Sequence, residues 1–168
     1  MHDGGLPAAD LAAMAHGVKE MLDDRYIRDR VEQTAFLAER LTRAGVPVVK
    51  PTDTHAVLVN ARQLLPHVDQ VQYPAQRLAA EIYLETGVRV TERGNVSKGR
   101  DPKTGENYRP VLELVRLTIP RRVYSNDHMA AVAGGIARLC QRRHEITGLR
   151  FVYEPPALRL FQGRFEPI

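Results

Sequence analysis

Hydrophobic residues recur every three or four positions near the start of the chain, the spacing of one face of an amphipathic α-helix. A first such stretch runs from about Pro7 to Leu22 and is interrupted by Asp23-Asp24. A second runs from Ile27 to Leu41 and stops at Gly45, a residue type that commonly follows the last turn of a helix. The pattern therefore predicts two consecutive helices.

Two further helices are predicted later in the chain. Pro74 suits the first turn of a helix that carries an apolar stripe and ends at Gly87. Ser125 is a good N-cap for a helix that runs to about Glu145 and is closed by Gly148.

The segments between these helices are short and rich in β-branched residues, which is typical of strands. The expected strands are Val46–Val49, Ala56–Val59, Val88–Thr91 and Leu112–Ile119. The first two bracket a turn cluster, Pro51-Thr52-Asp53-Thr54, and are expected to pair. A polar stretch from Gly94 to Arg109 is long for a loop in a compact domain, and loops of such length often carry function.

The order of these elements indicates an α+β fold with a small, mainly antiparallel sheet whose one face is covered by helices. No segment has the composition of a linker between domains. We therefore expect a single domain over residues 1–168, with a helical entry segment (1–45), an α/β part (46–168) and a last stretch of about twenty residues that is extended and partly packed.

Composition and charge exclude several classes of protein. Hydrophobic residues make up 43% and charged residues 26% of the chain, which is ordinary for a globular domain. No apolar run is long enough for a leader or a membrane span, so we expect a soluble, cytoplasmic protein without a membrane partner. The single Cys140 allows no internal disulfide and is expected to be buried filler. The net charge of +4 comes from scattered arginines rather than a basic cluster, which argues against a nucleic-acid partner.

The chain contains no complete catalytic motif of the kinds that mark hydrolases, nucleotide-binding loops or zinc sites. His128 and His144 lie sixteen positions apart, too far to share a metal ion. Arg116 is more informative, because a guanidinium within an apolar strand must either point to solvent or meet an anion. Alternation places it on one face of its strand with Leu114 and Thr118. Arg93 ends its expected strand, within a Glu-Arg-Gly sequence next to the long loop, and either an ion pair or a functional role would suit it there.

Several motifs, in order along nearly the whole chain, give a resemblance to a known family. They are Gly4-Gly5-Leu6, Tyr73-Pro74-Ala75-Gln76, Gly99-Arg100-Asp101-Pro102-Lys103-Thr104-Gly105, Leu114-Val115-Arg116-Leu117-Thr118-Ile119-Pro120-Arg121-Arg122-Val123-Tyr124, Gly148-Leu149-Arg150-Phe151 and Tyr153-Glu154-Pro155. The chain resembles the pyridoxal-phosphate-dependent β-eliminating lyases, the family of tyrosine phenol-lyases and tryptophan indole-lyases. The resemblance implies the small C-terminal domain of the aspartate-aminotransferase-like (fold type I) enzymes.

The resemblance also implies roles for particular residues. In the family, the arginine of the Arg-Leu-Thr-Ile-Pro-Arg motif binds the α-carboxylate of the amino-acid substrate, which gives this role to Arg116. His55 would lie near it as a supporting group. The arginine of Glu-Arg-Gly is typical of the phenol-lyase branch and lies near the leaving phenol, so Arg93 favours tyrosine as substrate. Leu160 and Phe161 would stand at the aromatic end of the site, although Leu160 replaces the Phe of phenol-lyases and the His of indole-lyases.

The resemblance implies cleavage of L-tyrosine to phenol, pyruvate and ammonia by the complete enzyme, a homo-oligomer with pyridoxal phosphate and a monovalent cation. The chain has four lysines, Lys19, Lys50, Lys98 and Lys103, and none stands in the family's Ser-x-Lys-Lys setting that holds the cofactor. We therefore expect a fragment that is inactive alone and that a complementing N-terminal chain would complete. The alternatives are a tryptophan indole-lyase fragment, a truncated chain, and a binding or assembly module that has lost catalysis.

Overall fold

A computed structural model describes residues 5–52, 55–120 and 122–168. Gly4 of the first family motif, Asp53 and Thr54 of the expected turn, and Arg121 lie outside the described residues. The helices are α1 (Ala8–Glu20), α2 (Asp24–Arg43), α3 (Ala61–Leu64), α4 (Pro74–Thr86), α5 (Asn95–Lys98), α6 (Asn126–Gln141) and α7 (Arg159–Gln162), with short 3-10 turns at Gln70–Gln72 and Arg143–Glu145. The strands are β1 (Ala56–Asn60), β2 (Thr91–Arg93), β3 (Leu114–Thr118), β4 (Leu149–Tyr153) and β5 (Arg164–Pro167).

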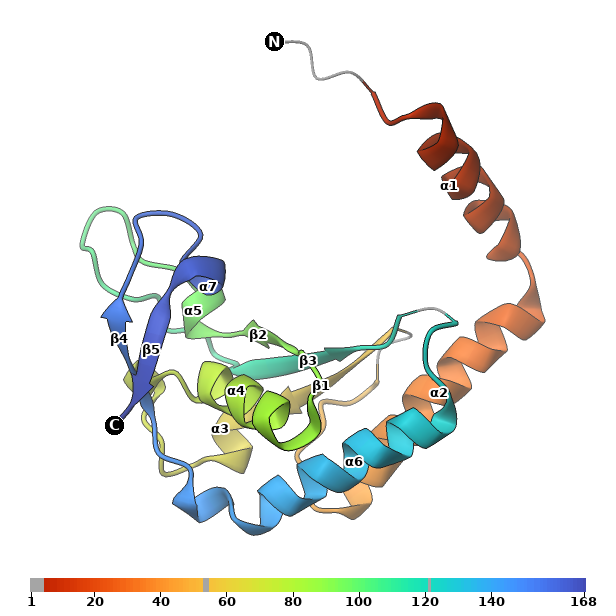
Figure 1. The fold of residues 1–168 in the computed structure, drawn as a ribbon. Helices are drawn as coiled ribbons and strands as arrows, with labels where there is room; N and C mark the ends of the chain where they lie inside the picture. The colour runs from red at the N-terminus through yellow and green to blue at the C-terminus, as the bar shows by residue number, and fades with distance from the viewer. Residues whose placement is uncertain (1–4, 53–54, 121) are drawn as a thin grey trace.

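The central sheet has the strand order β1-β3-β2, and both of its pairings are antiparallel. Successive side chains of a strand point to opposite faces. Val57, Val59, Val115 and Leu117 point to one face and are almost completely buried. This face packs against α2, α4 and α6, and Figure 1 shows these helices on one side of the sheet. The prediction of an α+β fold with an antiparallel sheet and helices on one face is confirmed at this level.

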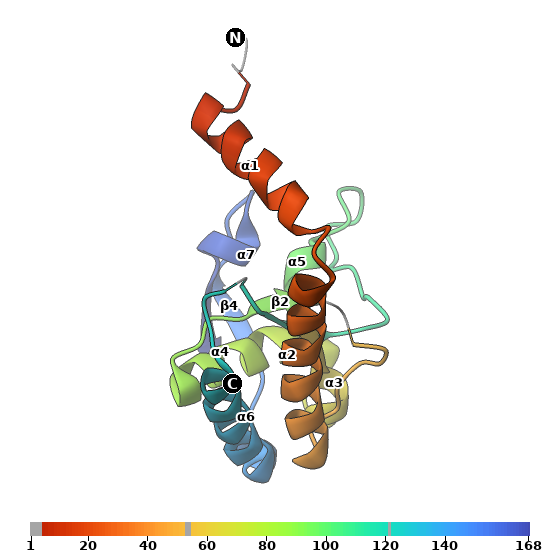
Figure 2. The ribbon, with the colours of Figure 1, turned by 90° about the vertical axis from the view of Figure 1, so that its right-hand side faces the viewer.

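Helices α2 and α6 lie side by side beneath the sheet (Figure 2). Asp23 caps α2 by accepting a hydrogen bond from the backbone N–H of Arg25. Ser125 caps α6 as predicted, in a box that the side chain of His128 completes. Helix α6 therefore begins where the sequence predicts, whereas α2 begins at Asp24, three residues before the start of the predicted periodic stretch. The apolar faces of the two helices supply the core with Leu37, Leu41, Ile136 and Leu139, each at most 1% exposed, and with the buried Cys140.

Helix α1 forms where predicted, but its apolar side is not buried. None of its residues is buried, and Leu11, Met14 and Val18 are each about half exposed or more. In Figures 1 and 2 the helix extends away from the sheet and the other helices. Amphipathic spacing predicts a helix with an apolar face, and it does not say whether a packing partner is present. Among the described helices, none is long and apolar enough to cross a membrane.

Two predicted strands are wrong in extent. The stretch Val46–Val49 makes only a single bridge, between Val48 and Val59, because Pro47 has no N–H to donate to a longer ladder. The stretch Val88–Thr91 is not a strand over most of its length, since β2 begins at Thr91. Val90 instead packs against the core from the connection that follows α4.

The C-terminal stretch is more regular than predicted. Strands β4 and β5 form an antiparallel hairpin around α7, and the expected long loop 94–109 begins with α5 and is closed by a bridge between Arg100 and Asn107. Tyr73 joins these parts, because its ring lies edge-on to Phe151 and Phe165 with centroids 5.1 and 5.8 Å away. The hairpin, α5 and α7 thus form a second small layer beside the central sheet, visible at the left of Figure 1.

Candidate functional site

The face of the central sheet opposite to the core is not covered by any described helix. We call it the open face. It consists of the alternate residues of the three strands: Ala56, Leu58, Asn60, Thr91, Arg93, Leu114, Arg116 and Thr118. Apart from Ala56, which is buried, these residues are half-buried or exposed, whereas their neighbours on the other face are buried. An antiparallel sheet with one packed and one solvated face is common, and arginines on the solvated face can meet a ligand.

Arg116 lies at the centre of the open face. It stands on the middle strand, paired in register with Leu58 on one side and Thr91 on the other. Its Nη2 lies 2.8 Å from Nε2 of His55, whose backbone carbonyl accepts a hydrogen bond from Ile119 N–H and is thereby fixed beside β3. The guanidinium has five N–H donors in a rigid fork, and the contact with His55 engages only one of its nitrogens. The arrangement suits a planar, bidentate acceptor such as a carboxylate.

Arg93 lies on the same face as Arg116. It pairs with Leu114, two residues before Arg116 on the middle strand, so the two guanidinium groups project from neighbouring positions of one surface. Arg93 is exposed, and within the described part of the chain it has no ion pair with a carboxylate. Two cations on one face without carboxylate partners make this surface attractive to an anion.

The turn after Arg93 is built by two buried glutamates. The Glu92 carboxylate accepts hydrogen bonds from the backbone N–H groups of Val96 (3.0 Å) and Ser97 (2.8 Å). Oε1 of Glu113 accepts from the N–H of Asn95 (2.9 Å). These three N–H groups belong to the first turn of α5, where a helix offers no internal acceptor. In the Glu-Arg-Gly sequence, Glu92 therefore has a structural role of its own, which is separate from any role of Arg93.

Gly94 completes this turn because no other side chain fits. A Cβ at this position would stand 2.1 Å from Oε2 of Glu113 and 2.9 Å from Oε1 of Glu92. Burial raises the pKa of Glu92, against the opposing effect of its hydrogen bonds from Ser97 and Val96. Burial also raises the pKa of Glu113, and the charge of Glu92 raises it further. The charge of either carboxyl group therefore disfavours ionisation of the other.

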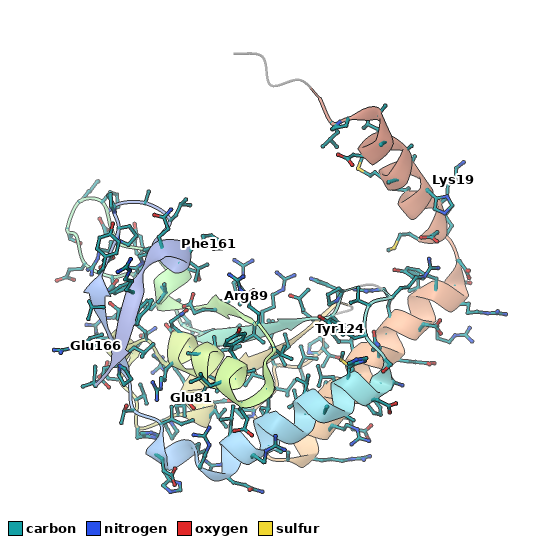
Figure 3. All side chains as sticks on the ribbon, in the orientation of Figure 1. Lys19, Glu81, Arg89, Tyr124, Phe161 and Glu166 are labelled. Carbon is teal, nitrogen blue, oxygen red and sulfur yellow. The ribbon has the colours of Figure 1, made fainter. Side chains whose placement is uncertain are left out.

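Leu160 and Phe161 line a hollow of about 270 Å³ between α4, β2 and α7. Thr91 also lines it, and Thr91 is the residue directly opposite Arg116 in the sheet. Leu160 is half-buried against the second core, whereas Phe161 is 74% exposed. Figure 3 shows Phe161 on α7. The structure thus brings the apolar pair close to the strand next to Arg116.

The lysines do not meet at this surface. Lys19 lies on α1 (Figure 3), Lys50 precedes β1, Lys98 ends α5 with its ammonium over the ring of Tyr108, and Lys103 lies in the following loop. All four are exposed, and none is on a strand of the central sheet. The described residues therefore do not fit pyridoxal phosphate by themselves, because the cofactor needs a lysine that faces the bound substrate.

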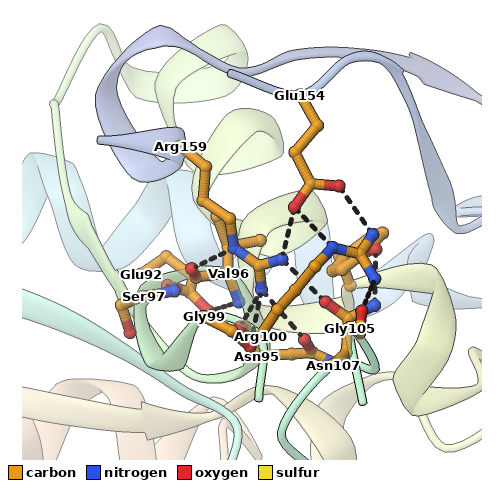
Figure 4. Close-up of polar contacts among 11 residues, drawn as sticks. Glu92, Asn95, Val96, Ser97, Gly99, Arg100, Gly105, Asn107, Glu154 and Arg159 are labelled. Atoms are coloured by element: carbon orange, nitrogen blue, oxygen red, sulfur yellow. Dashed lines mark hydrogen bonds and ion pairs between the residues drawn. The ribbon is translucent and has the colours of Figure 1, made fainter. Parts of the chain in front are cut away.

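Sequence reasoning missed three contributors. Thr91 was placed within a strand without a role, Glu113 was not distinguished from a surface glutamate, and Arg159 was placed in an extended tail. Arg159 is only 9% exposed and binds several backbone carbonyls (Figure 4). A usable signal was the alternation that places Glu113 on the same face as Val115 and Leu117, the face that proved to be the core.

The described residues thus place Arg116 beside His55 at the centre of the open face, Arg93 on the same face, and Leu160 and Phe161 at a hollow that Thr91 also lines. The β-eliminating lyase family model matches residues 11–134, about three quarters of the chain, and the chain belongs to this family. Its relatives include tyrosine phenol-lyases from Symbiobacterium sp. (55% identical), Pasteurella multocida (56%) and Intrasporangium calvum (57%), each matched over 98% of this chain. The chain spans only 35–36% of the length of these relatives, in their C-terminal part.

Proposed function

We propose that this chain supplies substrate recognition to a pyridoxal-phosphate-dependent β-eliminating lyase that cleaves L-tyrosine into phenol, pyruvate and ammonia. The observation that carries the proposal is the position of Arg116, central on the open face and held beside His55 at 2.8 Å. The identity to tyrosine phenol-lyases over nearly the whole chain supports the choice of reaction.

The role of Arg116 is to bind the α-carboxylate of the amino acid. A guanidinium–carboxylate pair makes two parallel, charge-assisted hydrogen bonds, which fix the plane of the carboxylate as well as its position. His55 restricts rotation of the guanidinium by occupying one side of it. The carboxylate is common to all amino-acid substrates, so this contact serves binding and orientation of each of them alike.

The role of Arg93 is to act at the other end of the substrate. Loss of phenol leaves developing negative charge on a ring that otherwise contacts apolar groups. A fixed cation near this ring stabilises the transition state more than the ground state. Leu160 and Phe161 provide the apolar contact from the hollow beside Thr91. The presence of Arg93 favours tyrosine over tryptophan, because indole leaves as a bulkier ring that is protonated on carbon.

Pyridoxal phosphate would serve the complete enzyme as an electron sink, bound by residues of the part that this chain does not span. An N-terminal chain that brings those residues could complete the site, and we propose that the complete enzyme is a homo-oligomer that also takes a monovalent cation. Within the described residues, no group of three or more histidine, cysteine or carboxylate side chains is placed to hold a metal ion. The open face is where the rest of the enzyme would meet this domain.

The test uses an enzyme completed by joining this chain to the upstream part of the Symbiobacterium tyrosine phenol-lyase, which we call the completed enzyme. Arg116→Ala is expected to lower kcat/KM for tyrosine and for S-methylcysteine by a similar factor. Loss of a charge-assisted pair costs about 1.5–3 kcal/mol, which corresponds to roughly tenfold to 150-fold. Arg116→Lys keeps the charge but loses the fork and should recover only part of the rate.

Thr118→Ala is the matched control, since Thr118 lies on the same strand and face and is exposed. It is expected to leave both rates within about twofold, because surface substitutions usually change free energies by less than 0.5 kcal/mol. Unchanged turnover in Arg116→Ala would remove Arg116 from the carboxylate role. A loss confined to tyrosine would do the same.

A further inference from the structure

Arg159 is the most extensively hydrogen-bonded side chain in the described part of the C-terminal layer, and no role described above uses it. It is the first residue of α7 and directly precedes Leu160 and Phe161. Its side chain is almost fully buried, which is costly for a charged group unless every donor finds a partner. We therefore consider what its contacts hold together.

All three nitrogens of the guanidinium are engaged (Figure 4). Nε donates to the carbonyl of Val96 at 2.8 Å, and Nη2 donates to the carbonyls of Asn95 and Gly99. Nη1 donates to Oδ1 of Asn107 at 2.7 Å and to Oε1 of Glu154 at 2.8 Å. Oδ1 of Asn95, 3.3 Å from Nη2, is a sixth acceptor, so the five N–H donors of the arginine face more acceptors than the three donors of a lysine could serve.

The acceptors come from three separate segments. The carbonyls belong to α5 and to the residue that ends it, Asn107 lies on the returning side of the long loop, and Glu154 follows β4. Glu154 also pairs with Arg100, and these two guanidinium groups, Arg100 first, hold the pKa of Glu154 below its usual value. The buried guanidinium of Arg159 thus connects α7 to α5 and to the loop that follows α5.

This connection bears on the candidate site because α5 begins two residues after Arg93. Residues Glu92 and Glu113 bind the first N–H groups of α5, as described above, and Arg159 binds carbonyls within α5 and the carbonyl of Gly99 directly after it. Leu160 and Phe161 directly follow Arg159 in the same turn of α7. Arg159 therefore links the segment that follows Arg93 to the apolar pair through hydrogen bonds, in addition to the packing of Leu160 against the cluster that contains Val96.

We propose that Arg159 is a positioning residue that sets the geometry of the aromatic end of the substrate site. This inference rests on the proposed function, which gives Arg93, Leu160 and Phe161 their contact with the ring. Arg159 itself touches no substrate. Its effect reaches the reaction through the spacing between Arg93 and the apolar wall of the hollow, and it does not extend to the carboxylate end, which β3 and His55 build.

The test compares two substrates in the completed enzyme. Arg159→Gln and Arg159→Lys are expected to lower kcat/KM for tyrosine by about tenfold or more, since a misplacement of about 1 Å can cost 10²-fold. Both variants should change kcat/KM for S-methylcysteine by less than about threefold, because this substrate has no ring. Arg164→Gln is the control, an exposed arginine on β5 in the same C-terminal segment, and it should leave both substrates unaffected.

A second readout follows the position of the segments directly. Hydrogen exchange should show faster exchange in residues 95–107 and 158–163 of Arg159→Lys, with α2 and α6 unchanged. Should Arg159→Gln not fold, Asn107→Ala carries the same substrate comparison, because it removes one contact of Arg159 and leaves the charge in place.

An equal loss with both substrates, or no loss with tyrosine, would overturn the positioning role. Unchanged exchange in residues 95–107 would also overturn it. Failure of the unsubstituted completed enzyme to release pyruvate from either substrate would instead overturn the proposed function, and the positioning role with it. Turnover of S-methylcysteine therefore separates the two failures.

Discussion

Replacing Glu113 by glutamine is expected to stabilise this chain at pH 8 and to have little effect at pH 4. The Glu113 side chain is completely buried, and burial raises its pKa, with a further contribution from the charge of Glu92. As the pH rises, the unfolded chain therefore releases this proton before the folded chain does. The free energy of unfolding contributed by the group is present below its ordinary pKa and is lost as the pH rises toward the folded-state value.

The magnitude follows from the surroundings of the carboxyl group. Glutamine keeps the shape of the side chain and the carbonyl oxygen that accepts hydrogen bonds from Asn95 N–H and Gln70 Nε2, but it carries no charge. It removes the repulsion with Glu92, whose carboxyl group lies against the same side of Gly94. A buried polar group without full compensation costs about 1–3 kcal/mol, and we expect a gain within this range at pH 8.

Urea denaturation followed by circular dichroism between pH 4 and pH 8 measures the effect, provided that the transition is two-state. Glu106→Gln is the control, because Glu106 is exposed in the nearby loop, and its curve should run parallel to that of the unsubstituted chain. A loss of stability in Glu113→Gln at pH 8 would show that the ionised carboxylate stabilises the fold. In that case our reasoning about the two buried glutamates would be wrong.

Two further predictions concern the core and the leaving group. Ile82→Ala removes a fully buried side chain and should lower the free energy of unfolding by about 2–5 kcal/mol. Leu84→Ala, on the same helix at a position 75% exposed, should change it by less than about 0.5 kcal/mol. Urea denaturation of the two variants measures both changes. In the completed enzyme, Arg93→Val should reduce kcat for tyrosine much more than for S-methylcysteine, which carries a good leaving group. An equal reduction for both substrates would make Arg93 structural.

Much of the central layer could be predicted from local patterns. Alternation along β3 places Arg116 on one face of the sheet and Val115 and Leu117 on the other. Because Val115 and Leu117 are buried, the face that carries Arg116 is the one exposed to solvent. The last long helix was predictable because its periodicity and its cap at Ser125 agree. Which face of the sheet is open depends on tertiary packing, and the alternation alone leaves that choice undecided.

The C-terminal layer could not be predicted because long-range contacts hold it together. Residues 95–98 form one helical turn whose N–H groups are satisfied by side chains from β2 and from the start of β3, and whose carbonyls are satisfied by Arg159 more than sixty residues later. An arginine in a segment rich in proline and aromatic residues is usually exposed to solvent. Nothing local to Arg159 indicates that its donors would be buried.

Release of phenol from L-tyrosine by the completed enzyme, compared with release of indole from L-tryptophan, tests the central claim most directly. Pyruvate formation can be followed with both substrates and with S-methylcysteine in one coupled assay. The account predicts turnover of tyrosine and S-methylcysteine, with tryptophan the poorest of the three. Turnover of tryptophan equal to or faster than that of tyrosine, at normal turnover of S-methylcysteine, would contradict the role given to Arg93 and the choice of tyrosine as substrate.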